Sequence, residues 1–235
     1  MAYFAHSSFR LRRLGVFALA AGLLALSVAG CVRLLEPRTS DATYYLLGER
    51  AAPSAASPQA PSPTDTTGLR VGLRKPRLAS YLDATRIVTR RGPHQVQFAE
   101  FHRWGEELDR GIGRTVATRL AARPEVRGVE VVPWSPGASF DYVVELHVLR
   151  FEGVGPAPDP EADEDAPPPD GHAQVVVEWT VLRPGTDAVL ARQTTRHRAA
   201  AWPVGNYSAL VARLGAGLDT LVEEVAAQLS RLNAS

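Results

Sequence analysis

The single cysteine, Cys31, constrains what this chain can fold into more than any other residue. It follows a cationic stretch containing Arg10, Arg12 and Arg13 and an apolar run over residues 14–29. The run is shorter than the ~20 apolar residues that cross a bilayer and has the length of the hydrophobic region of a signal peptide. An exported domain with one cysteine forms no intrachain disulfide, so packing alone must hold it together.

The residues around Cys31 predict a lipid anchor. Small residues precede it, and the lipobox pattern places signal-peptide cleavage between Gly30 and Cys31. The thiol would carry a diacylglycerol and the freed amine an N-acyl chain, with each buried CH₂ adding about 0.8 kcal/mol to membrane affinity. The alternative is a coincidental cysteine behind an ordinary signal peptide. An Asp directly after the lipidated cysteine would favour retention in the inner membrane, but Val32 stands there. We therefore expect the protein to be anchored at the periplasmic face of the outer membrane.

The chain divides into a signal peptide over residues 1–30, a tether over 31–42 and one domain over 43–235. Two segments interrupt the domain: residues 51–67 are rich in Pro, Ser and Ala, and residues 153–171 are acidic and rich in proline. Both compositions bury little apolar surface, so we expect flexible insertions. The acidic segment lacks the spacing of a calcium loop, and no metal site is predicted there.

Hydropathy patterns predict a single α/β domain. Alternating or short apolar runs indicate strands, at residues 43–47, 69–73, 86–90, 95–98, 129–132, 140–151, 172–183 and 189–200. Helical spacing over residues 106–122 aligns Leu108, Ile112, Val116 and Leu120. A second amphipathic helix is predicted over residues 207–232, where the aligned apolar residues are Leu210, Leu214, Leu218, Leu221, Val225, Leu229 and Leu232. We therefore expect a two-layer sandwich of a mixed β-sheet and two main helices, after a signal peptide and tether.

Composition and motifs argue against several classes of function. The net charge is +1 with no polybasic run in the mature chain, so nucleic acid is not an expected partner. There is no Gly-x-Ser-x-Gly elbow, and the only cysteine is assigned to the lipid. The histidines of the mature chain lack metal-binding spacing: His94, His102, His147, His172 and His197. We predict a non-enzymatic protein with no metal and no cofactor beyond the lipid on Cys31.

The segment Phe101-His102-Arg103-Trp104 concentrates aromatic and charged residues. Aromatic side chains with arginine often dominate the binding energy of protein interfaces, which favours a site for partner docking or self-assembly. In the alternative interpretation, Phe101 and Trp104 lie one helical turn apart and join the helix start to the sheet. Glu100 and Arg103 would then pair at the surface.

These residues belong to a longer series of motifs that resembles a known family. The series comprises Tyr44-Tyr45-Leu46-Leu47, Tyr81-Leu82-Asp83, Ile87-Val88-Thr89-Arg90, Ala99-Glu100-Phe101-His102-Arg103-Trp104, Leu108-Asp109, Val132-Pro133-Trp134, Asp141-Tyr142, Arg150-Phe151, Trp179 and Tyr207-Ser208-Ala209-Leu210-Val211. Together they cover almost all of the mature chain and resemble the PqiC (YmbA-like) family of ABC-type transport auxiliary lipoproteins.

The resemblance implies a periplasmic α/β domain within an MCE-type lipid transport system. Such a system combines a permease and an ATPase with MCE-domain proteins that form a conduit across the periplasm. The lipoprotein would dock this conduit at the outer membrane, in the form of a ring-shaped homo-oligomer. Two other readings stay open: a lipoprotein that itself carries phospholipid, and a structural lipoprotein of the envelope.

Overall fold

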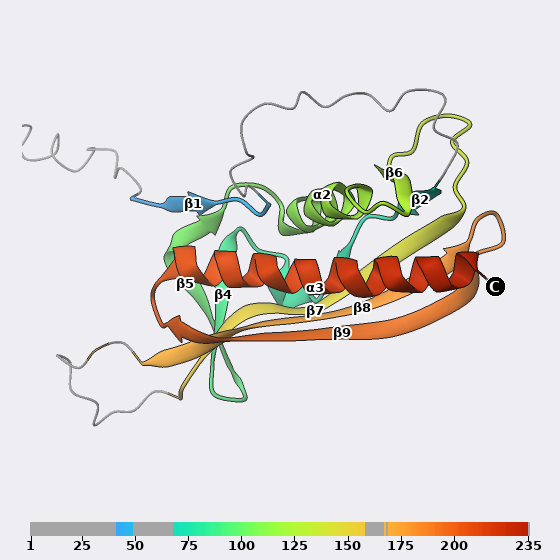
Figure 1. Cartoon of the computed structure of the whole chain (residues 1–235). Helices are drawn as coiled ribbons and strands as arrows, with labels where there is room; N and C mark the ends of the chain where they lie inside the picture. Colours follow the sequence, from blue (N-terminus) through green and yellow to red (C-terminus); the bar gives the residue numbers. More distant parts are fainter. Residues whose placement is uncertain (1–40, 49–67, 158–166, 168, 235) are drawn as a thin grey trace, which may run out of the picture. The chain divides into compact units, whose positions relative to one another are not determined.

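The computed structural model describes residues 41–48, 68–157, 167 and 169–234 (Figure 1). The predicted signal peptide, Cys31, most of the tether and the insertion at 51–67 lie outside these residues. Ala42–Ser235 forms one compact unit, described below.

One mixed sheet contains all nine strands of the described part of the chain. The strands are β1 (Thr43–Tyr45), β2 (Leu69–Leu73), β3 (Arg77–Leu78), β4 (Arg86–Arg91), β5 (Gln95–Trp104), β6 (Val126–Val131), β7 (Tyr142–Gly155), β8 (Asp170–Arg183) and β9 (Ala188–Pro203). The long strand β7 pairs in parallel with β2, β3 and β4 in turn, and antiparallel with β8. At one margin, β1 pairs in parallel with β5. The eight predicted strands are therefore present, and β3 is an additional two-residue strand.

Two long helices cover one face of this sheet (Figure 1). They are α2 (Leu108–Ala121) and α3 (Tyr207–Asn233), and a 3-10 turn, η2 (Ser80–Leu82), precedes β4. The predicted apolar faces are buried, except that Leu232 at the end of α3 is only partly buried. Ile112, Val116 and Leu120 of α2 are at most 1 % exposed. Asn206 caps α3 by accepting a hydrogen bond from the Ala209 amide at 3.0 Å, as expected for an Asn at a helix start. The two-layer α/β sandwich is confirmed.

The core lies between the helices and the covered face of the sheet. Along β7, Val144, Leu146 and Val148 alternate into it, as the sequence pattern predicts. Trp179 of β8 is fully buried, and its indole N–H donates to the Thr195 hydroxyl at 3.0 Å. A buried indole that keeps a hydrogen bond stabilises the core without leaving its polar group unsatisfied.

The acidic insertion is shorter than the sequence suggests. We expected a loop from residue 153 to residue 171, but β7 continues to Gly155 and β8 begins at Asp170. The ring of Trp202 explains this extension: a Cβ at Gly153 would lie 2.5 Å from the Trp202 ring. The glycine therefore leaves room for the indole directly against β7. Residues 158–166 and 168 lie outside the described part.

A second expectation was wrong. The segment from Phe101 to Trp104 is not helical but forms the end of strand β5. The segment pairs with both β4 and β1, so its main-chain N–H and C=O groups find hydrogen-bond partners in the sheet. These hydrogen bonds stabilise the strand more than any local preference for helix stabilises a helix. Residues three apart therefore point to opposite faces of a strand instead of sharing one face of a helix.

Candidate docking site

Strand alternation separates the four predicted docking residues into two pairs. His102 and Trp104 point toward the helices: the His102 ring stacks on Tyr207 of α3 at 4.0 Å, and Trp104 is 5 % exposed with its ring 6.0 Å from Phe151. Phe101, 52 % exposed, and Arg103 point to the opposite face. The structure thus leaves Phe101 and Arg103 available for docking and places the other two in the packing of the fold.

His102 also links β1 to the rest of the domain. The Tyr45 hydroxyl and His102 Nδ1 share a hydrogen bond of 3.0 Å, on the side where His102 stacks on Tyr207. Burial raises the pKa of the Tyr207 hydroxyl, so it stays neutral in this contact. These contacts attach the edge strand to the start of α3.

Arg103 and its neighbour across the sheet, Arg86, have no ion pair with any described residue. The predicted surface pair of Glu100 with Arg103 is therefore absent from the described contacts. Arg103 Nε is buried without a hydrogen-bond partner, and the Arg86 guanidinium lies 5.3 Å from the centre of the Phe98 ring. No carboxylate among the described residues therefore neutralises either guanidinium.

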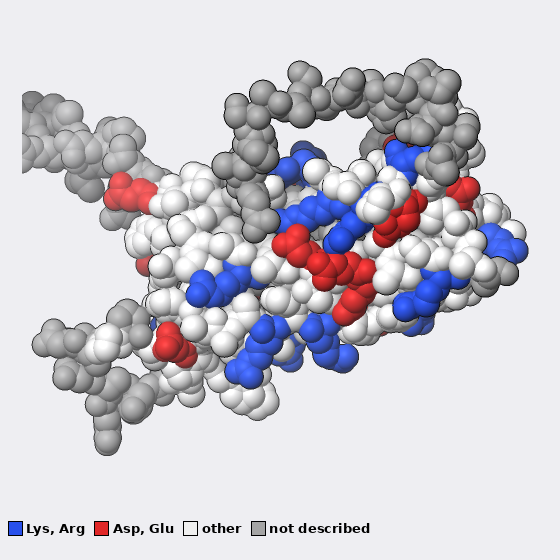
Figure 2. All heavy atoms as spheres, in the orientation of Figure 1, with Lys and Arg blue, Asp and Glu red and all other residues white. Residues whose placement is uncertain are grey.

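Exposed apolar side chains gather at the same margin of the sheet. Of the large apolar residues exposed in the described part, four lie on or next to β1 and β5, and Val189 of β9 is the fifth. The four are Tyr44, Leu46, Phe98 and Phe101. In Figure 2 the surface over β1 is largely free of charged side chains, which gather over α2 and α3 instead. Clustered exposed apolar residues are typical of interaction sites.

A groove runs between β1 and α3, next to this margin. Its volume is about 620 Å³, and it is lined by Tyr45, Leu46 and Gly48 on one side and by Ser208, Ala212 and Ala216 of α3 on the other. Sequence reasoning missed the groove together with Tyr44 and Leu46, because it treated residues 43–47 as an ordinary first strand. The absence of any charge or proline in these five residues was the available signal, since edge strands usually carry one.

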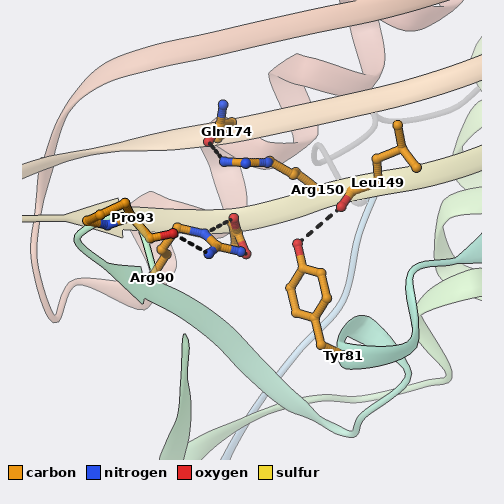
Figure 3. Close-up of polar contacts among 7 residues, drawn as sticks. Tyr81, Arg90, Pro93, Leu149, Arg150 and Gln174 are labelled. Atoms are coloured by element: carbon orange, nitrogen blue, oxygen red, sulfur yellow. Dashed lines mark hydrogen bonds and ion pairs between the residues drawn. The ribbon is translucent and has the colours of Figure 1, made fainter. Parts of the chain in front are cut away.

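A second group of motif residues forms a polar cluster between β4 and β7 (Figure 3). Arg90 donates from Nε to Glu152 Oε1 at 2.7 Å, and the Glu152 side chain is fully buried. The Tyr81 hydroxyl donates to the Leu149 carbonyl at 3.1 Å, and burial raises its pKa to about 12. A carboxylate with a single buried arginine partner and a neutral tyrosine is a structural arrangement that holds η2 and β4 against β7.

The described ranges also bear on metal sites, other grooves and membrane spans. No three His, Cys, Asp or Glu side chains there lie close enough to hold a metal ion together. A groove of about 590 Å³ beside α2 is lined by apolar groups such as Pro76, Val131 and Pro133, with Lys75 at its rim already paired to Asp109 at 2.8 Å. None of the described helices is long and apolar enough to cross a membrane.

The described part of the chain is thus an α/β domain with exposed apolar side chains at one margin of its sheet. The chain belongs to the family of ABC-type transport auxiliary lipoprotein components, whose model matches residues 45–226. The predicted family is thereby confirmed. The match supports a lipid-modified protein of the cell envelope that is anchored to a membrane and associates with a transport system.

Two solved structures share the fold. Protein XCC0632 from Xanthomonas campestris is 19 % identical over 79 % of this chain and 93 % of that one, with a TM-score of 0.59. An uncharacterised protein is 15 % identical over 80 % of this chain and 98 % of that one, with a TM-score of 0.57. At such identities these similarities bear on the fold alone. No curated protein matches the chain.

Proposed function

We propose that the chain is a non-catalytic accessory component of an MCE-type intermembrane lipid transport system. Lipid on Cys31 would hold it at the periplasmic face of the outer membrane, after removal of the signal peptide over residues 1–30. The tether over residues 31–42 would let the domain meet the tip of the conduit, while a partner ATPase uses ATP elsewhere. The observation that carries the proposal is the family match over residues 45–226.

The docking surface we propose consists of Phe101 and Arg103, together with Arg86, which lies opposite Arg103 in the sheet, and Phe98, whose ring centre lies 5.3 Å from the Arg86 guanidinium. Aromatic residues and arginine are enriched among the residues that carry binding energy at interfaces. Phe101 is exposed, and Arg86 lies next to the exposed Phe98 ring. His102 and Trp104 would act indirectly, by fixing β5 against the helices. The same surface could also hold copies of the chain together in a ring.

The test is crosslinking in intact cells. A C-terminally tagged chain would be purified from detergent-solubilised membranes, and the captured proteins identified by mass spectrometry. We expect an MCE-domain protein, with or without its permease and ATPase. Phe101→Ser should lower its recovery about tenfold or more, as for an interface hot spot. Val189→Ser is the matched control, because Val189 is 55 % exposed and Phe101 52 %.

Two results would contradict the proposal. Recovery of the chain alone with stoichiometric phospholipid would favour an independent lipid carrier. If neither an MCE-domain protein nor phospholipid is recovered, the result would favour a structural lipoprotein of the envelope over a transport component. Equal recovery of the MCE-domain protein by both serine variants would show that Phe101 is not part of the docking surface.

A further inference from the structure

Among the described residues, strand β1 has an open main-chain edge. The Gly105 amide donates to the Tyr45 carbonyl at 2.8 Å, so the polar groups of Tyr45 point toward β5. The N–H and C=O groups of successive residues point to opposite sides of a strand. The N–H and C=O of Tyr44 therefore point away from β5, and β1 has no second neighbour in the described sheet.

This edge lacks the usual protection against pairing. Natural edge strands carry charges, prolines or bulges that block a further strand. Residues 43–47 read Thr-Tyr-Tyr-Leu-Leu and contain none of these groups. Tyr44 and Leu46 are 62 % and 51 % exposed. An unprotected apolar edge of this kind is a template for an extended segment.

The groove of about 620 Å³ provides room for such a segment. It lies between the β1 side, at Leu46, and the small side chains of Ala212 and Ala216 on α3. Arg119 of α2 and Asp219 of α3 also line the groove and pair at 3.0 Å, so the two charges compensate each other. A neutral but polar lining suits a peptide backbone better than an acyl chain, which would leave these groups without water.

We propose that an extended segment of the transport partner adds to β1 as a further strand and lies in the groove against α3. The inference rests on the proposed function, of which it specifies the mode of docking. Charge favours a partner over a second copy: Arg103, the β5 residue opposite Tyr44, has no acidic partner among the described residues, and a second copy would bring the same arginine to the pairing. The partner segment would carry apolar residues for Tyr44 and Leu46 and a nearby carboxylate.

The first test alters the open edge. Tyr44→Pro removes the outward N–H that the added strand would use, whereas Tyr44→Val keeps it and favours a strand. We expect Tyr44→Pro to lower recovery of the MCE-domain protein from crosslinked cells about tenfold relative to Tyr44→Val. The thermal unfolding midpoints of the two purified variants would show whether β1 itself is disturbed.

The second test fills the groove without changing β1. Ala212→Arg places a long side chain in it, and Ala227→Arg adds the same side chain at another exposed position of α3. We expect only Ala212→Arg to reduce recovery of the MCE-domain protein. A photoreactive amino acid at position 46, but not at position 227, should crosslink to that protein in cells carrying the otherwise unchanged full-length chain.

The outcomes separate the inference from the function on which it rests. If the wild-type chain and all four variants recover the MCE-domain protein equally, the docking mode is wrong and the proposed function stands. Crosslinks from position 46 only to another copy of the chain would assign the edge to self-assembly and overturn the inference. Failure of the wild-type chain to recover any MCE-domain protein would overturn both proposals.

Discussion

Arg90 and Glu152 form the most deeply buried ion pair among the described residues. The Glu152 side chain is fully buried and that of Arg90 is 13 % exposed, and hydrogen bonding to Glu152 raises the pKa of Arg90. Such a pair adds little net stability compared with apolar side chains, because both charges lose their hydration. Removing one partner is costly, since it leaves the other charge buried alone.

Arg90→Met should therefore lower the free energy of unfolding by about 3–5 kcal/mol. The physical cause is the unpaired Glu152 carboxylate, so the double variant Arg90→Met/Glu152→Leu should recover most of the loss. Urea unfolding of the three proteins measures both effects. A double variant as unstable as Arg90→Met would show that the pair contributes more than mutual compensation of charge.

At the scale of elements, α3 depends on how closely it approaches the sheet. A Cβ at Gly217 would lie 2.5 Å from Val175 Cγ2 of β8, so the glycine sets the distance between helix and strand. Gly215, half a turn away, meets nothing nearer than Arg119 Nη2 at 3.7 Å. The sequence shows two glycines in one helix, but only the packing shows that Gly217 lies in a close contact and Gly215 does not.

Substitution of these glycines by alanine should have opposite effects. Gly217→Ala should destabilise the domain, because overpacking costs about 1–3 kcal/mol and the gain in helix propensity is at most about 1 kcal/mol. Gly215→Ala should stabilise it by about 0.5–1 kcal/mol. Unfolding in urea checks both variants. Equal stabilisation by the two alanines would refute the close approach at Val175.

The elements themselves were largely predictable from the sequence. Local periodicity indicated both helices and eight of the strands, because each element buries one face along its own length. It failed at Arg77–Leu78, which is too short for a pattern, and at Phe101–Trp104, where aromatic spacing suggested a helix. Phe101 and Arg103, which we propose for docking, were named from the sequence, but their separation from His102 and Trp104 became visible only in the strand.

At the scale of the whole molecule, an exported chain with one cysteine depends on packing and on its anchor. The described core spans Leu47 to Leu229 and joins both helices to the sheet. The compact unit Ala42–Ser235 contains that core, and Cys31 lies outside it. We therefore expect folding and anchoring to be separable.

Cys31→Ser should remove the anchor and leave the fold unchanged. Mass spectrometry of the mature wild-type chain should find Cys31 at the N-terminus, carrying a diacylglycerol and an N-acyl chain. The serine variant should lack these lipids and be absent from the outer-membrane fraction, yet keep the thermal unfolding midpoint of the delipidated wild-type domain. An unmodified cysteine in the wild-type chain would contradict the predicted lipobox.

The sequence by itself determined the order and type of most elements and their buried faces, and it supplied the motifs that place the chain in its family. These properties are local, since each is encoded by a few neighbouring residues. Only the tertiary structure decided that Arg90 meets Glu152, that Gly217 approaches Val175, and that a groove lies between β1 and α3. Such contacts join residues far apart in the chain, and strand order and register, which no local pattern encodes, decide which of them meet.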